Sequence, residues 1–115
     1  MKIILEKERP LNWNIYYSQR HWSKRSKDAQ YVHSLFYGAK TLYNKDEMHI
    51  SFPVKITIIA YMTGRCFDAD NICSKMYVDG LKGWLLPDDS YKYVESVTTK
   101  VVKVKEKPRI EILID

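Results

Sequence analysis

The segment 52–62 constrains the fold of this chain more than any other part of the sequence. It is rich in β-branched residues, which favour strands. Polar Lys55 and Thr57 interrupt a regular series of apolar positions, namely Val54, Ile56, Ile58 and Ala60. Because successive side chains of a strand point to opposite faces, this alternation predicts a strand with one face in a core.

Two helices are predicted, one on either side of this strand. Residues 28–43 carry apolar side chains at steps of three and four, which is typical of one helix face. Residues 71–82 carry a shorter pattern, at whose end stand Gly80 and Gly83. Residues 9–27 lack clean periodicity, so they are expected to form a long ordered loop.

Further strands are expected at residues 3–8, 93–105 and 109–114, with a turn at Lys107 and Pro108 between the last two. The predicted order is therefore β, loop, α, β, α, β, β. This order is typical of an α/β or α+β domain in which two helices cover a small mixed sheet.

Length and charge limit the classes of protein to which the chain can belong. The chain has 115 residues, of which 45% are hydrophobic, which predicts one domain over residues 1–115 with a core of its own. A domain of this size gains stability from pairing, so a homodimer is favoured. The net charge of +5 and the pI of about 9.1 favour a polyanionic partner.

The cysteines and the hydropathy of the chain indicate the cellular compartment of the protein. Cys66 and Cys73 do not form a Cys-x-x-Cys pair, and they are expected to be free thiols in a reducing cytoplasm. No apolar run is long enough for a signal peptide or a membrane span. We therefore expect a cytoplasmic protein without a membrane partner.

Acidic residues stand where the central strand gives way to the second helix. In an extended segment, Asp68 and Asp70 would point to the same side, and paired carboxylates suit Mg²⁺ with a phosphate substrate. Asp88 and Asp89 form a second acidic site, and Asp89 would join the pair only if the chain ran back. Alternatively, Asp70 is an N-cap of the second helix and Asp88 and Asp89 form a solvated turn.

An ordered set of motifs resembles the RusA family of Holliday junction resolvases. The motifs are Arg9-Pro10-Leu11-Asn12-Trp13-Asn14-Ile15-Tyr16-Tyr17, Asp68-Ala69-Asp70-Asn71, Lys75, Asp79-Gly80-Leu81 and Asp88-Asp89-Ser90. They span almost the whole chain. The resemblance implies a RusA-like fold and a homodimer that cuts four-way DNA junctions by paired nicks in DNA recombination and repair. Resolvases of this type are often carried by phages and prophages.

The resemblance also implies roles for particular residues. Asp68, Asp70 and Asp89 match the essential carboxylates, which would hold Mg²⁺, or alternatively Mn²⁺. Lys75 matches the catalytic lysine, but it stands five residues after Asp70, where the family usually has four. Either the helix starts one residue later, or Lys75 points elsewhere and Ser74 takes its place. In catalysis, Lys75 would neutralise charge on the phosphate or orient the attacking water.

Basic and aromatic residues crowd the expected loop 9–27. The candidate DNA-binding residues are Arg20, Lys24, Arg25, Lys27 and, in a later strand, Lys100. Cations of this kind contact phosphates, and exposed rings stack on unpaired bases. Alternatively, the rings belong to the core and the cations are solvated. Lys100, Lys103, Lys105 and Lys107 would lay charge along one sheet face if they alternated in a strand.

Two other functions stay open at this point. The displaced Lys75 is compatible with a catalytically impaired nucleic-acid-binding module of the same fold. The acidic residues alone are compatible with a small metal-binding structural protein. Metal-dependent cleavage of branched DNA would separate the endonuclease from both.

Overall fold

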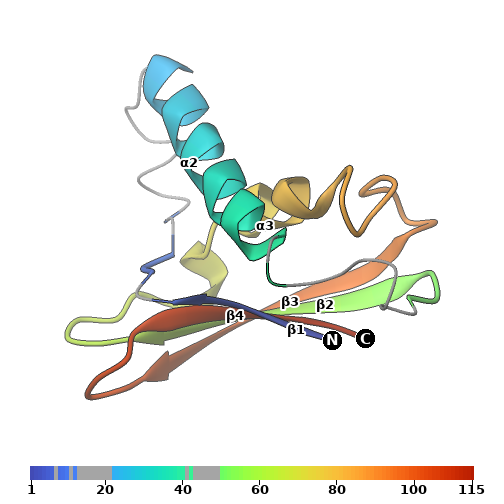
Figure 1. Ribbon diagram of the computed structural model, residues 1–115. Coiled ribbons are helices and arrows are strands. Elements are labelled where there is room, and N and C mark those ends of the chain that lie inside the picture. The colour runs from blue at the N-terminus through green and yellow to red at the C-terminus, as the bar shows by residue number, and fades with distance from the viewer. Residues whose placement is uncertain (7, 11, 13–21, 41, 43–49) are drawn as a thin grey trace.

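The computed structural model of the chain describes residues 1–6, 8–10, 12, 22–40, 42 and 50–115, and within 22–29 the backbone alone. These residues form four strands and two α-helices (Figure 1). The strands are β1 (Lys2–Glu6), β2 (Val54–Met62), β3 (Val94–Lys103) and β4 (Arg109–Ile114). The α-helices are α2 (Trp22–Lys40) and α3 (Ser74–Leu81), and a 3-10 helix, η2 (Ala69–Asn71), precedes α3.

The strands form a single sheet in the order β1-β4-β2-β3. β3 pairs with β2 in parallel, and β4 pairs with β2 and β1 in antiparallel fashion. The parallel pair requires a crossover, which η2 and α3 provide. The predicted small mixed sheet with two helices is therefore confirmed, as is the order of the elements. Within the described residues, no helix has the length and apolar character needed to span a membrane.

One face of the sheet forms the core. The alternation predicted for β2 is confirmed, because Val54, Ile56, Ile58, Ala60 and Met62 are all buried. Both α2 and α3 lie over this face (Figure 1). Each helix contributes apolar side chains to the core, among them Val32, Phe36, Ala39, Met76, Tyr77 and Leu81.

The two helices touch at a glycine. An ideal Cβ placed on Gly80 of α3 would lie 2.3 Å from Cδ2 of Phe36 in α2. The Phe36 ring also lies 6.4 Å from the Trp84 ring, centroid to centroid. Gly80 therefore allows a close approach of α2 to α3. The sequence pattern had assigned Gly80 only to the end of a helix.

Two helix boundaries differ from the sequence-based prediction. α2 begins at Trp22, so the expectation of a loop is wrong for residues 22–27. Lys24, Arg25 and Lys27 favour helix without forming an apolar stripe, so apolar periodicity does not predict this turn. α3 begins at Ser74 with Cys73 as its N-cap. The alternative role of Asp70 as that N-cap is therefore wrong.

No described element covers the second face of the sheet. Register places three rows of side chains across it, from β1 through β4 and β2 to β3. The rows are Lys2-Leu113-Thr57-Thr98, Ile4-Glu111-Ile59-Lys100 and Glu6-Arg109-Tyr61-Val102. We call these twelve residues the open face.

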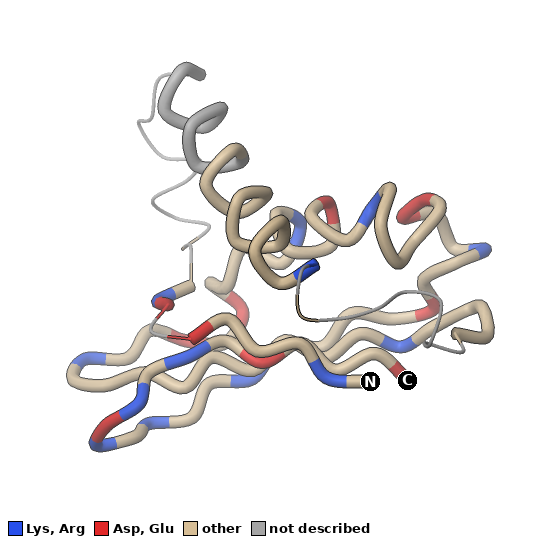
Figure 2. Tube along the Cα trace, viewed as in Figure 1, with Lys and Arg blue, Asp and Glu red and all other residues tan. Residues whose placement is uncertain are grey.

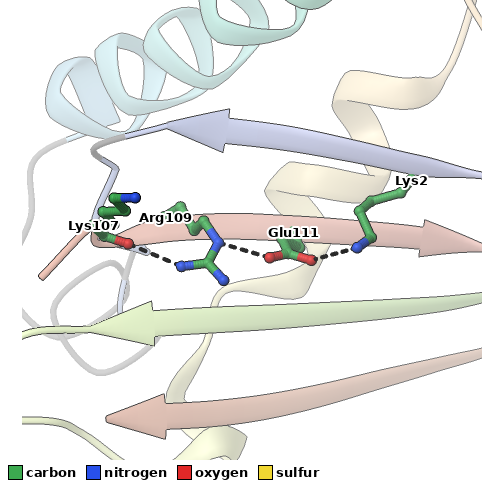
Figure 3. Close-up of polar contacts among 4 residues, drawn as sticks. All are labelled: Lys2, Lys107, Arg109 and Glu111. Carbon is green, nitrogen blue, oxygen red and sulfur yellow. Dashed lines mark hydrogen bonds and ion pairs between the residues drawn. The ribbon is translucent and has the colours of Figure 1, made fainter. Parts of the chain in front are cut away.

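A carboxylate lies buried at the middle of the open face. Glu111 is only 5% exposed, and it accepts a hydrogen bond from Nε of Arg109 at 2.7 Å. Nζ of Lys2 lies 3.2 Å from its other oxygen, as Figure 3 shows. The Arg109 guanidinium also lies 3.8 Å above the centre of the Tyr61 ring. Burial alone would raise the pKa of Glu111, but the hydrogen bonds and charges of Arg109 and Lys2 outweigh it and hold that pKa below its usual value.

This network predicts a pH-dependent stability. Unfolded Glu111 titrates near 4.5 and folded Glu111 lower, so its contribution is complete at neutral pH and is lost as the pH falls through the folded pKa. We expect Glu111→Gln to lose about 1–2 kcal/mol of stability at neutral pH. The difference from the wild type should shrink below about pH 4.5, as measured by chemical denaturation. Glu106→Gln, an exposed control, should show no such difference. A gap that stays constant down to about pH 3 would contradict the assignment.

Candidate active site

Asp68 and Asp70 lie just beyond the carboxyl end of β2. Asp68 precedes η2 and Asp70 lies within it, and both side chains are exposed. The turn is closed by a hydrogen bond from Asn71 N–H to the Asp68 carbonyl at 3.0 Å. The expectation of an extended segment is therefore wrong here, because a 3-10 turn rotates successive side chains by about 120°. Among the described residues, neither carboxylate has an ion-pair partner.

The N-terminal motif lies against this acidic segment. Asn12 forms a β-bridge with Ile72, one residue after η2. Nη2 of Arg9 donates a hydrogen bond to the Arg65 carbonyl at 2.7 Å, and its guanidinium lies 5.6 Å from the centre of the Phe67 ring. Segments about sixty positions apart in the sequence are thus joined on both sides of Asp68 and Asp70.

The same N-terminal segment is also tied to α2. The hydroxyl of Tyr31 donates a short hydrogen bond to the Glu8 carboxylate. This bond, with a smaller effect from burial and from the Glu8 charge, raises the pKa of Tyr31 to about 12. The bond connects the helix to the segment that meets the acidic pair.

Asp89 does not lie beside Asp68 and Asp70. The first residue of β3, Val94, pairs with Val54 at the start of β2, whereas Asp68 follows the end of β2. An Asp89 oxygen lies 3.6 Å from Nζ of Lys82, just past the carboxyl end of α3. An eight-residue helix is about 12 Å long, so α3 separates Asp89 from Asp70. Among the described residues, no three His, Cys, Asp or Glu side chains are grouped closely enough to hold a metal.

Asp89 is nevertheless kept ionised. Its partial desolvation would raise its pKa, but a hydrogen bond with Asp88 and the charge of Lys82 outweigh that effect and lower the pKa of Asp89 below the usual value. Asp88 is exposed beside it. The pair forms a solvated turn, as one of the two sequence-based alternatives expected.

Lys75 is directed along α3. Its exposed Nζ lies 3.5 Å from the carboxylate of Asp79, one helical turn further on. α3 begins at Ser74, three residues later than the start expected from the sequence, and Lys75 pairs with Asp79. The match of Lys75 to a catalytic lysine stays a prediction.

Asp79 was quoted in the motif but given no role in the sequence analysis. It lies between Lys75 and Lys82, whose Nζ is 3.8 Å from Oδ1 of Asp79. Among the described residues, this Oδ1 is the one buried side-chain N or O atom without a hydrogen-bond partner. Asp79 thereby joins Lys75 of α3 to Lys82, the C-cap residue of that helix, and Lys82 in turn contacts Asp89. The i,i+4 and i,i+3 spacings of these charges would have predicted this contact.

Only some of the candidate DNA-binding residues lie in the part of the chain whose side chains the structure describes. Arg20 lies outside the described residues. Lys24, Arg25 and Lys27 belong to the backbone of α2, and their side chains lie outside the described part. Lys100 is exposed on β3, opposite Ile59 on the open face.

The expected stripe of lysines along one sheet face is wrong. Lys103 ends β3 three residues after Lys100, so the two point to opposite faces. Lys105 and Lys107 lie in the β3–β4 connection, beyond the strand. This connection and the loop after β2 lie at the same end of the sheet, and both carry basic residues (Figure 2). Since Asp68 follows that loop, the basic end of the sheet adjoins the acidic pair.

Within the described part of the chain, Cys66 and Cys73 form no disulfide, as expected from the sequence. Compared with known proteins, the chain matches no family model, no curated protein and no solved structure.

Proposed function

We propose that this protein is a Mg²⁺-dependent endodeoxyribonuclease that resolves four-way DNA junctions by paired nicks. The observation that carries the proposal is the meeting of two distant motifs. Arg9 and Asn12 contact the segment from Arg65 to Ile72, which presents Asp68 and Asp70 to solvent. A nuclease needs such exposed carboxylates beside cations that hold the phosphate backbone.

The donor set fits Mg²⁺ through two carboxylates. Mg²⁺ commonly binds one or two carboxylates and keeps its other positions for water and substrate phosphate. Asp68 and Asp70 would be those ligands, and Asp89 does not lie with them in this structure. Bound Mg²⁺ would polarise the scissile phosphate and activate water.

Basic side chains of the chain itself would bind the DNA and offset charge on the reacting phosphate. Arg65, Lys103 and Lys105, at the basic end of the sheet, would hold the DNA backbone through its phosphates. Lys75, in the first turn of the helix that follows the acidic pair, would offset negative charge on the reacting phosphate after release from Asp79. These roles place substrate binding and chemistry at one end of the molecule.

The test is incubation of the purified protein with a synthetic four-way junction and a matched linear duplex. Each reaction is run with Mg²⁺, with Mn²⁺ and with chelator. Paired, metal-dependent nicks confined to the junction are expected. Equal cutting of the duplex would contradict selectivity for structure, and metal-independent cutting would contradict the role of Asp68 and Asp70.

A second candidate is a nucleic-acid-binding module of the same fold without turnover. It is favoured by the position of Asp89 on the far side of α3 and by the pairing of Lys75 with Asp79. In the same assay, this function predicts salt-sensitive binding of junction DNA and no product with any divalent metal.

Mg²⁺ is expected to raise the melting temperature of the wild-type protein. Asp68 and Asp70 repel each other when both are charged, and a cation that binds only the folded state stabilises it by mass action. At ten times the dissociation constant the gain is about 1.4 kcal/mol. Scanning fluorimetry with and without Mg²⁺ measures the shift. The Asp68→Asn, Asp70→Asn double variant should lose it, and a shift that the double variant keeps would place the cation elsewhere.

A further inference from the structure

The outer edge of β1 carries backbone groups that no described strand pairs with. Met1 exchanges two hydrogen bonds with Ile114, of 2.9 and 2.8 Å. Because bonding alternates along an antiparallel pair, the backbone N–H and C=O groups of Lys2, Ile4 and Glu6 point away from β4. Among the described elements, β4 is the one strand beside β1. The outer edge therefore offers a donor and an acceptor at every second residue.

A groove lies directly beside this edge, between β1 and the carboxyl-terminal half of α2. Its volume is about 360 Å³, within the range of about 300–1,000 Å³ that is usual for ligand sites. The apolar part of its lining comes from Leu5 of β1, from Leu35 and Ala39 of α2, and from Leu42 just beyond the helix. Leu42 is 81% exposed. We call this hollow the β1 groove.

The edge and the groove have the geometry of a single binding site. In an added strand, side chains directly opposite those of β1 would point to the same face of the sheet. Leu5 points to the helix-covered face, where it is buried. Every second side chain of an added strand would therefore enter the β1 groove, while its backbone bonded to Ile4.

The other edge of the sheet differs from β1. The edge strand β3 carries exposed Lys100 and Lys103, and lysine on an edge strand opposes pairing with other chains. The middle of β1 is instead an unbroken apolar run, Ile3–Leu5. β1 thus lacks the protection that β3 has, although both are edge strands.

Carboxylates beside the groove indicate the charge of its partner. Glu6 is exposed at the end of β1 and has no ion-pair partner among the described residues. The half-buried Glu8 also lines the groove, where its carboxylate accepts the hydrogen bond of Tyr31. These charges would repel the phosphates of DNA. A lysine or arginine opposite Glu6 on an added strand would instead form a favourable cross-strand pair.

We propose that the β1 groove binds an extended segment of another protein, which joins the sheet as a further strand beside β1. The segment has aliphatic side chains at alternate positions and at least one basic residue between them. Main-chain hydrogen bonds to Ile4 supply affinity, and the groove and Glu6 supply specificity. Asp68, Asp70 and Lys75 do not line the groove, so this inference does not depend on the proposed function.

The test uses a fluorescein-labelled peptide, Ser-Lys-Leu-Thr-Leu-Lys-Ser, and the full chain. The peptide reads the same in both directions, so it suits a parallel or an antiparallel added strand. Its leucines share one face and its lysines the other. Fluorescence anisotropy should show saturable binding below millimolar protein. The same peptide with glutamate in place of both lysines should bind more weakly.

Two pairs of variants separate backbone pairing from apolar contact. Ile4→Pro removes the outward N–H of an edge strand and leaves the bonds to β4 in place, so the dissociation constant should rise at least about tenfold. Ile4→Thr keeps the N–H and should bind like the wild type. Leu42→Gln should weaken binding about fivefold through lost apolar contact. Its control is Tyr37→Gln, at an exposed position of α2 away from the groove, which should change nothing.

A charge exchange checks the role of Glu6. Glu6→Lys should weaken binding of the lysine peptide and strengthen binding of the glutamate peptide. Absence of binding by the wild type up to millimolar concentration would overturn the proposal. Unchanged binding by Ile4→Pro would also overturn it, because the groove would then hold an apolar ligand without strand pairing. So would a doubled mass of the free chain that Ile4→Pro halves, since a second copy would then occupy the edge.

Discussion

Asp70→Asn is expected to lower the rate of junction cleavage by about a thousandfold, equivalent to about 4 kcal/mol in the barrier. The amide keeps the shape of the side chain but removes the charge that would hold Mg²⁺. Binding of the junction should persist or strengthen, since one negative charge beside the DNA is removed. Single-turnover cleavage and a gel-shift titration on the same junction separate the two effects.

The matched control for this variant is Asp115→Asn. Asp115 is exposed beyond β4, and its replacement removes the same charge at a site with no proposed role. Its cleavage rate should equal that of the wild type. Full activity of Asp70→Asn would refute the assignment of this carboxylate, and equal loss in both variants would show that net charge alone matters.

Gly80→Ala is expected to lower the melting temperature by about 10 °C. The added Cβ would stand 2.3 Å from the Phe36 ring, which is only 1% exposed. The overlap is severe, so its cost is expected at the upper end of the range for overpacking, about 3 kcal/mol, of which the helix preference of Ala over Gly offsets about 1 kcal/mol. About 2 kcal/mol of net loss corresponds to a shift of roughly this size in a small domain. Thermal unfolding by circular dichroism measures it.

Gly38→Ala provides the opposite case within the same protein. Gly38 lies in α2 with no heavy atom within 4 Å of an added Cβ, so the substitution should stabilise by up to about 1 kcal/mol. Adding Phe36→Leu to Gly80→Ala should cost less than the two single changes added together, because the smaller side chain relieves the clash. Strict additivity would mean that the helices do not meet at this point.

The sequence was informative where one local pattern decides the structure. Alternation placed β4 at its observed bounds and assigned the buried side of β2 correctly, because the side-chain period of a strand is independent of its neighbours. The start of α2 was missed, since its first turns carry no apolar stripe. Local sequence patterns also did not predict the position of Asp89, because that position depends on where α3 and the following turn direct the chain.

The open face illustrates the same difficulty. Lys2, Arg109 and Glu111 come from opposite ends of the sequence, and their charges read individually as ordinary solvated residues. They meet only because β4 lies between β1 and β2. No spacing within the sequence predicts that strand order, and so none predicts the buried carboxylate.

The pairing of β1 with β4 has a consequence for how the chain acquires its structure. During synthesis β1 leaves the ribosome well before its partner, which spans Arg109–Ile114. Joining segments so distant in sequence requires closure of a long loop, which slows folding. Until β4 has emerged, β1 has no strand to pair with, and one side of β2 has an exposed hydrogen-bonding edge. The nascent chain therefore passes through a stage in which this edge can bind other chains, a risk that ends when the last strand enters between the two.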